Sequence, residues 1–274
     1  MQINSYINTP KSKAVIAQRQ VIHNKSDYTC QTLPAFADAK SLVNIKFRGK
    51  IHEFAAEGNW EGIQQELDNG VDINEKDIMG NTALIRASLN EREDVVEKLL
   101  THPDIKVNLK NKIGNTALIN ACIVGNTKMA EQLLQNPDID VNIQNNSGDT
   151  ALMLACFNGQ ADTVETLLQK PNTDVNLQNE VGLTALMRAS LNGRDEVVEK
   201  LLIHPDIDVN VQDKWGDTAL ILAEVMRYSD IAINLLQHPD IDVNLKNNKD
   251  QDALYYADYL ATQMIHAIQS QKNS

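Results

Sequence analysis

The stretch Gly-Asn-Thr-Ala-Leu-Ile at residues 80–85 decides the fold of this chain, because closely related stretches follow it at a constant interval. The glycine recurs every 34 residues, at Gly80, Gly114, Gly148, Gly182 and Gly216. A proline recurs with the same period, at Pro103, Pro137, Pro171, Pro205 and Pro239. An asparagine does so at Asn74, Asn108, Asn142, Asn176, Asn210 and Asn244. Several markers in one register indicate a tandem array of short units.

One unit predicts a pair of short helices followed by a protruding loop. Gly80 allows a turn, because a positive φ costs glycine little. Thr82 is a natural N-cap for a first helix. Apolar residues over 95–100 mark a second helix, which ends before Pro103 because proline cannot continue it.

Such short helices need neighbours, because isolated helices of fewer than about 12–15 residues are marginal in water. A stack of units covers the apolar faces and makes a solenoid. A small residue recurs in the first helix, at Ala87, Ala121, Ala155, Ala189 and Ala223. Leu-Leu pairs recur in the second helix, at 99–100, 133–134, 167–168, 201–202 and 235–236. We expect the alanines to allow close packing and the leucines to fill the core.

The repeated units resemble ankyrin repeats. The pattern of that family is Gly-x-Thr-Pro-Leu-His, an alanine-rich first helix, a Leu-Leu pair and Val-Asn before the next loop. The resemblance covers about residues 47–269 and implies an all-α ankyrin-repeat solenoid. We expect repeats at about 47–78, 79–112, 113–146, 147–180, 181–214 and 215–248, and a capping partial repeat at 249–274.

The chain departs from the family pattern in two ways. An apolar residue replaces the family histidine, at Ile85, Ile119, Met153, Met187 and Ile221, so we expect apolar packing in place of its hydrogen bond. The period is 34 residues instead of about 33, and Pro-Asp-Ile stands where the family has Gly-Ala. A proline therefore replaces the left-handed glycine that ends the second helix. This subtype is similar to arrays of intracellular bacteria and protists.

Composition narrows the class of protein. The net charge of −12 argues against nucleic-acid binding by the repeats, because phosphate contacts need Lys and Arg. No apolar run approaches the roughly 18 residues of a membrane span, and no secretory signal is evident. Three cysteines form no even disulfide framework, which favours a reducing compartment. We expect a monomeric cytoplasmic protein, in the producing cell or in a host cell.

Residues 1–46 differ from the repeats and are expected to form a basic extension. Residues 1–50 carry eight Lys or Arg and two Asp, a charge of +6, so the remainder carries −18. This arm could bind an anionic lipid or a nucleic acid, fold back on the array, or serve as a flexible leader. We favour the last two and expect a short helix over residues 36–48.

No residue pattern indicates catalysis, a cofactor or a metal. His102, His204 and His238 share one repeat position and could form a metal ladder, but the intermediate units carry Asn136 and Lys170 there. We interpret these imidazoles as groups that complement a helix C-terminus.

Three other recurring positions have structural explanations. Cys122 and Cys156 share a position with Ser88 and Ser190 and are interpreted as small core residues. The aspartates after the second helix could bind calcium, but no unit has the glycine-containing carboxylate loop of a calcium site. We interpret them as a solvated ridge. The Asn108-type residues are expected to bond the local backbone of their own loop.

Positions that vary between units indicate where a partner binds, because the recurrent residues build the stack. In ankyrin-like arrays these positions are the loop tips and the inner surface of the first helix. We predict partner contact at Met79, Ile113, Ile123, Phe157, Val181, Leu183, Leu191 and Trp215. The alternative is that the first-helix residues pack under the loops.

The sequence thus predicts a protein–protein interaction module or scaffold that uses its concave face and loop tips and has no enzymatic activity. Two related roles stay open. One is an inhibitor or antitoxin-like regulatory subunit of an enzyme, and the other is a bacterial effector delivered into a host cell. An enzyme is disfavoured, because no nucleophile–base pairing is visible and the N-terminal extension is short for a catalytic domain.

Overall fold

The computed structural model of the 274-residue chain describes residues 50–272. Residues 1–49 and 273–274 lie outside the description, and so do the expectations for the basic extension over 1–46 and the short helix over 36–48. Within residues 50–272 the backbone forms helices joined by turns and loops, without strands.

The described helices occur in pairs that follow the repeat. The first, here called the inner helices, are α3 (Lys50–Glu57), α5 (Ala83–Leu89), α7 (Ala117–Val124), α9 (Ala151–Asn158), α11 (Ala185–Leu191), α13 (Ala219–Met226) and α15 (Ala253–Tyr256). The second, here called the outer helices, are α4 (Trp60–Asp68), α6 (Glu93–Leu100), α8 (Thr127–Leu134), α10 (Ala161–Leu168), α12 (Asp195–Leu202), α14 (Ser229–Leu236) and α16 (Tyr259–Lys272). All the helices before α16 are too short to be stable alone in water.

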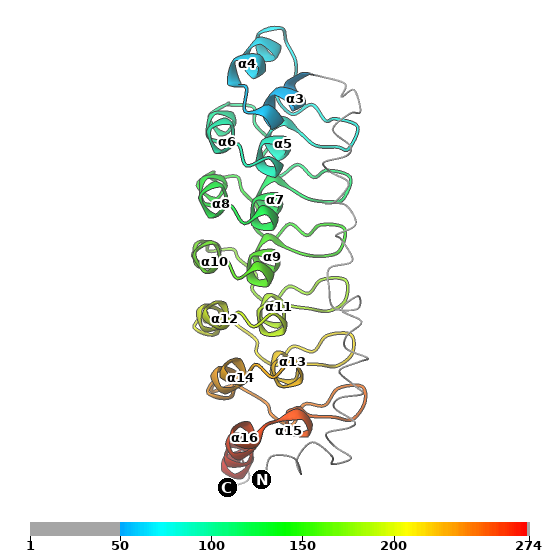
Figure 1. Cartoon of the computed structure of the whole chain (residues 1–274), viewed down its shortest axis with the longest axis vertical. Helices are drawn as coiled ribbons and strands as arrows, with labels where there is room; N and C mark the ends of the chain where they lie inside the picture. Colours follow the sequence, from blue (N-terminus) through cyan, green and yellow to red (C-terminus); the bar gives the residue numbers. More distant parts are fainter. Residues whose placement is uncertain (1–49, 273–274) are drawn as a thin grey trace, which may run out of the picture. The chain divides into compact units, whose positions relative to one another are not determined.

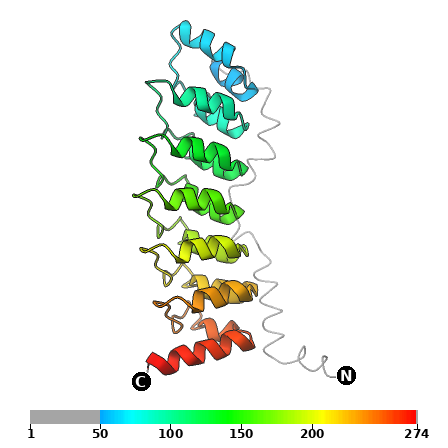
Figure 2. The same ribbon diagram turned by 90° about the vertical axis from the view of Figure 1, so that its left-hand side faces the viewer.

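The inner helices form one column, and the outer helices form a second column beside it (Figure 1). Each inner helix from α5 to α13 packs against the inner helices before and after it and against its own outer helix. The outer helices stack on one another from α6 to α16. A loop projects from the inner column on the side away from the outer helices (Figure 1), and the loops follow one edge of the stack when it is seen from the side of the outer helices (Figure 2). This stack confirms the predicted all-α solenoid.

A threonine starts each inner helix from α5 to α13, as predicted. The Oγ1 of Thr150 accepts the backbone N–H of Met153 at 3.2 Å. The same bond is made by Thr82, Thr116, Thr184 and Thr218. Before α15 an aspartate takes this place, and the Oδ1 of Asp252 accepts the N–H of Tyr255.

The outer helices from α6 to α14 end without a left-handed residue. Their C-caps are right-handed, at Thr101, Gln135, Gln169, Ile203 and Gln237. The recurring proline follows two residues later and prevents the helix from continuing. This confirms that the proline replaces the family's glycine cap.

Aliphatic and small side chains from both columns make the core. The recurring inner-helix alanine is fully buried in each unit, and so is the first leucine of each Leu-Leu pair. The second leucine varies: Leu134 and Leu236 are buried, whereas Leu100, Leu168 and Leu202 are half-buried. The first leucine therefore carries most of the packing between units.

Two further expectations about the core are confirmed. The residues that replace the family histidine are all buried. In the first described unit, which precedes them, the histidine is retained as His52, and its Nε2 lies 2.7 Å from the backbone O of Glu75.

Cys122 and Cys156 are buried and not disulfide-bonded. Burial raises the pKa of the Cys122 thiol to about 12 and that of Cys156 well above its ordinary value. Both thiols are therefore unreactive core groups.

Candidate protein-binding face

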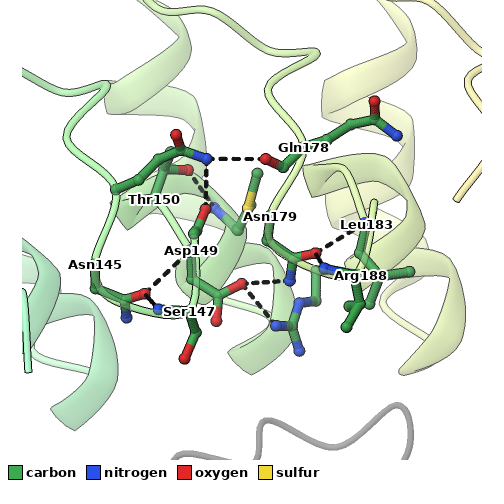
Figure 3. A network of polar contacts seen from close by, with 12 residues as sticks. Asn145, Ser147, Asp149, Thr150, Gln178, Asn179, Leu183 and Arg188 are labelled. Carbon is green, nitrogen blue, oxygen red and sulfur yellow. Dashed lines mark hydrogen bonds and ion pairs between the residues drawn. The ribbon is translucent and has the colours of Figure 1, made fainter. Parts of the chain in front are cut away.

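Each loop before an inner helix from α5 to α15 ends in a tight turn. We call the loop a finger and, where the turn contains a glycine, the residue before that glycine the fingertip. The Oδ1 of Asn145 closes one turn by accepting the backbone N–H groups of Ser147 at 2.9 Å and Asp149 at 3.0 Å (Figure 3). The same two bonds are made by Asp77, Asn111, Asn179, Asp213 and Asn247. One side chain therefore sets the shape of each finger.

Neighbouring fingers touch at their tips. The backbone N–H of Asn146 donates to the carbonyl of Ile113, the fingertip of the preceding finger, at 3.1 Å. The equivalent donors for the other fingertips are Lys112, Glu180, Lys214 and Asn248. Gly114 permits this approach, because its φ is +82° and a Cβ there would lie 2.5 Å from the backbone N of Asn146. A side chain at this glycine would force the two fingers apart.

Side-chain amides that are buried or half-buried link the bases of the fingers. The Nδ2 of Asn179 donates to the Oδ1 of Asp149 at 2.8 Å (Figure 3). The same link joins Asn111 to Asn81, Asn145 to Asn115 and Asn247 to Asp217. The Nε2 of Gln178 adds a bond to the backbone O of Gln212 in the next finger at 2.9 Å. The fingers are thus joined into one continuous row.

The recurring asparagines form a second row of links, which corrects the expectation for Asn108. Its Nδ2 donates to the backbone O of Asp138 at 2.6 Å, and its Oδ1 accepts the N–H of Asp140 at 2.9 Å. Both partners belong to the next unit, so this residue joins two repeats and does not bond its own loop. The same pair of bonds is made by Asn74, Asn142, Asn176 and Asn210.

The recurring histidines also have a role different from the predicted one. The Nδ1 of His102 accepts the backbone N–H of Asp104 at 3.2 Å, and His204 and His238 accept the equivalent N–H at 3.3 Å. The Oδ1 of Asn136 takes this place in its own unit. These side chains close the turn around the proline and do not complement the helix end.

The aspartates of the predicted ridge also bond the backbone. Three of them, Asp140, Asp208 and Asp242, accept the N–H of the asparagine two residues later, and Asp174 makes the same bond in its own unit. Over the part of the chain that the structure describes, no group of three or more His, Cys, Asp or Glu side chains is placed to hold a metal ion.

Three of the predicted contact residues are large apolar fingertips in solvent. Met79 is 39% exposed, Ile113 44% and Trp215 37%. The fingertip Val181 is half-buried. These side chains stand on fingers that hydrogen bonds hold in place, so their positions relative to one another are set by the fold.

The predicted contacts on the inner helices divide into two groups. Ile123 and Phe157 are half-buried, with part of each side chain at the surface. Leu183 is 0% exposed and Leu191 is 9% exposed, so the prediction of partner contact is wrong for these two residues. Both side chains belong to the core, Leu191 at the end of α11 and Leu183 in the turn before that helix.

Sequence reasoning missed a buried ion pair next to Phe157. The Nη2 of Arg188 lies 2.7 Å from the Oδ1 of Asp149 in the preceding unit, and both side chains are buried (Figure 3). The guanidinium carbon of Arg188 lies 5.7 Å from the centre of the Phe157 ring, within the range of a cation–π contact. An arginine in an otherwise apolar helix was the available signal.

A second ion pair lies in the first finger. The Nη2 of Arg86 is 2.5 Å from the Oδ2 of Asp77. Burial acts to raise the pKa of Asp77, but hydrogen bonds from Asn81 and the Arg86 charge outweigh it and hold the pKa below its ordinary value. Asp77 is therefore ionised at neutral pH and keeps the first finger closed.

The helices and the repeat now allow the family to be stated. No helix among residues 50–272 is long and apolar enough to cross a membrane. A family model described as ankyrin repeats in three copies matches residues 51–145, 105–179, 138–213, 170–247 and 186–265, which together span well over half of the chain. The chain is an ankyrin-repeat protein. Ankyrin-repeat domains typically mediate protein–protein interaction and are usually non-catalytic.

Solved ankyrin-repeat structures share this fold. The ankyrin repeat domain of Bcl-3, a member of the IkappaB family, has a TM-score of 0.70 at 23% identity, with 81% of this chain and 98% of that one covered. The domain of human ASB11 has a TM-score of 0.63 at 24% identity, with 80% and 97% covered. The ankyrin repeat protein EF0377 has a TM-score of 0.62 at 26% identity, with 73% and 98% covered.

Curated relatives match this ankyrin-repeat protein over a short segment. Osteoclast-stimulating factor 1 of Bos taurus is 40% identical over 57 residues, which are 21% of this chain and 27% of that protein. The protein of the same name from Rattus norvegicus is 39% identical over a segment of the same length. The matched segment thus spans about a quarter of these relatives.

Proposed function

We propose that this array binds a partner protein on the face made by the fingertips and the exposed parts of the inner helices, and that it does not catalyse a reaction. The observation that carries the proposal is the exposure of Met79, Ile113 and Trp215 on fingers held by hydrogen bonds. Apolar side chains grouped on one face of a protein mark interaction sites.

The rigidity of the fingers supports the same function. A surface that is already ordered loses little conformational entropy when a partner binds, so more of the contact energy appears as affinity. Aromatic side chains dominate interface energetics, which makes Trp215 the strongest candidate anchor. Ile123, Phe157 and Val181, each half-buried, provide flanking apolar surface.

A capture experiment with the full chain tests this proposal. The fingertip variant Met79→Ser/Ile113→Ser/Trp215→Ser should bind the partner at least about tenfold more weakly than the wild type, because interface anchors carry most of the binding energy. The control is Ile203→Ser, because Ile203 is 84% exposed and lies at the end of outer helix α12. Circular dichroism checks that all three proteins are folded.

Photo-crosslinking tests which face of the array the captured partner contacts. A photoreactive residue at position 113 or 215 should crosslink to the captured protein, and one at position 203 should not. Full retention of the partner by the folded fingertip variant, or crosslinking from position 203 alone, would contradict the proposal.

The same experiment separates the roles that stay open. If the captured protein is an enzyme whose activity falls when the array is added, the array is an inhibitor or antitoxin-like subunit. If its activity is unchanged, a scaffold is favoured.

A cytoplasmic monomer is part of this proposal, and light scattering of the purified chain tests whether it is a monomer. Delivery into a host cell as an effector would be tested by fractionating infected cells.

A further inference from the structure

Glu224 on inner helix α13 occupies a core position that other units fill with a small side chain. The equivalent residues are Ser88, Cys122, Cys156 and Ser190, and all four are fully buried. Glu224 is also buried, with 3% of its surface exposed. A buried carboxylate is costly when ionised unless it is paired, so the surroundings of this group decide its charge.

The carboxyl of Glu224 faces the C-terminal cap, which we define as α15, α16 and the residues between them. Its Oε1 has no hydrogen-bond partner in the described structure. The backbone N–H of Asp258 bonds the carboxyl, and the Asp258 carboxylate and the Arg227 guanidinium are the charges that act on it. Arg227 directs its Nη1 to the backbone O of Tyr256 at 2.7 Å. Glu224 thus lies beside a like charge that belongs to the cap.

Other helices packed against α13 bring no neutralising charge. On α11 the charged side chain is Arg188, whose Nη2 pairs with Asp149 in a preceding unit. On α14 the acidic side chain Asp230 is exposed. On α15 the titratable groups are tyrosines, and the hydroxyl of Tyr256 donates to Gln251.

The pKa values of the two neighbouring carboxyls are shifted in opposite directions. Burial, with the Asp258 charge second, raises the pKa of Glu224 to about 7, against the opposing effects of Arg227 and the Asp258 N–H. The N–H of Ala261 holds the pKa of Asp258 below its ordinary value, against some burial and with help from Ser229. The Oδ1 of Asp258 accepts that N–H at 2.9 Å, so Asp258 is an ionised cap at the start of α16.

We infer that Glu224 makes the packing of the C-terminal cap on α13 depend on pH: protonated Glu224 holds the cap in place, and ionised Glu224 loosens it through burial of a charge beside Asp258. The stabilising contribution of the protonated group is complete below the ordinary pKa of glutamate. It is lost as the pH rises through about 7, the value in the folded state. The cap therefore opens more readily on the alkaline side of neutrality.

Amide hydrogen exchange of the full chain tests this inference. Exchange of α15 and α16 is compared between the wild type and Glu224→Gln at each pH, so that the intrinsic pH dependence of exchange cancels. At about pH 8 the wild-type cap should exchange at least on the order of tenfold faster than the variant, and at about pH 4, below the ordinary pKa of glutamate, the two rates should approach each other. The control Asp230→Asn, exposed on α14, should follow the wild type throughout.

A second variant keeps the test independent of the buried substitution. Asp258→Asn retains a good helix cap and removes the neighbouring charge, so the midpoint of the wild-type pH dependence should move to lower pH. A ratio of wild-type to Glu224→Gln exchange that is the same at both pH values would overturn the inference. So would an unchanged midpoint in Asp258→Asn.

Discussion

At the scale of single residues, the pair formed by Asp213 and Leu183 is an exception in the row of finger links. The side chain of Asp213 has no amide N–H to donate, and the side chain of Leu183 has no oxygen that could accept a hydrogen bond. The Oδ1 of Asp213 still accepts the N–H groups of Trp215 and Asp217, each at 2.9 Å, but its Oδ2 has no partner in the described structure. Burial, together with the nearby Asp217 charge, raises the pKa of Asp213 to about 6, although backbone N–H groups oppose this.

Exchanging the pair for the one found one repeat earlier should restore the missing bond. In Leu183→Asp/Asp213→Asn the new side chains reproduce the link between Asp149 and Asn179. Each single change leaves a buried polar group without its partner. The double variant should therefore be more stable, by about 1–3 kcal/mol, than the sum of the two single effects on the free energy of unfolding predicts. Urea denaturation of the four proteins measures the coupling. Additive effects would show that the two positions do not interact.

At the scale of helices, the two leucines of one outer helix should differ in their effect on stability. Leu167 on α10 is fully buried, whereas Leu168 is half-buried. Leu167→Ala should lower the free energy of unfolding by about 2–5 kcal/mol, because a cavity remains where the side chain packed. Leu168→Ala should cost less than half as much. Chemical denaturation checks both variants, and equal losses would contradict the assignment of the core.

The helices could be predicted from the sequence because their signals are local. Thr150 caps the helix that follows it, and Pro171 comes just after the helix that it ends, so each boundary can be recognised within one unit. The roles of Asn108 and Leu183 could not be predicted in this way. Their partners lie in other units, and a reading of single units does not show which side chains meet across a repeat boundary. The common 34-residue period of Asn108 and Asp140 was the available sign of such a bond.

The same limit applies to the candidate site. The fingertips Met79, Ile113 and Trp215 could be selected because they differ between units and sit beside an invariant turn. Leu191 and Phe157 occupy the same repeat position but differ in burial, so position alone could not separate them. Arg188 was missed because its partner Asp149 is 39 residues away in the sequence.

At the scale of the whole array, stability should follow from contacts between neighbouring units. Each inner helix packs on the units immediately before and after it, as expected for a solenoid. Removal of residues 113–146 joins Lys112 to Ser147 in register and keeps the links at Asn111 and Asp149. The shortened chain should therefore remain helical, with a single cooperative thermal transition. Circular dichroism measures both properties.

Removal of half a unit is the matched control for that deletion. Loss of residues 113–129 removes α7 and the first three residues of α8 and shifts the following finger out of register, so the rest of α8 loses the inner helix that it packs on. This shorter deletion should destabilise the array more than the longer one. A greater loss of helix or of melting temperature after removal of the whole unit would contradict nearest-neighbour stability.

The row of fingers also sets a length requirement on anything that binds it. Ile113 and Trp215 stand on fingers three units apart, and helices packed side by side are about 10 Å apart, so these two tips are separated by about 30 Å. An α-helical segment needs about 20 residues to cover that distance. A shorter helical motif can reach Ile113 or Trp215 but not both. A rigid protein surface with two apolar sites at this separation can engage both tips at once, so the array would select its partners by their dimensions as well as by their chemistry.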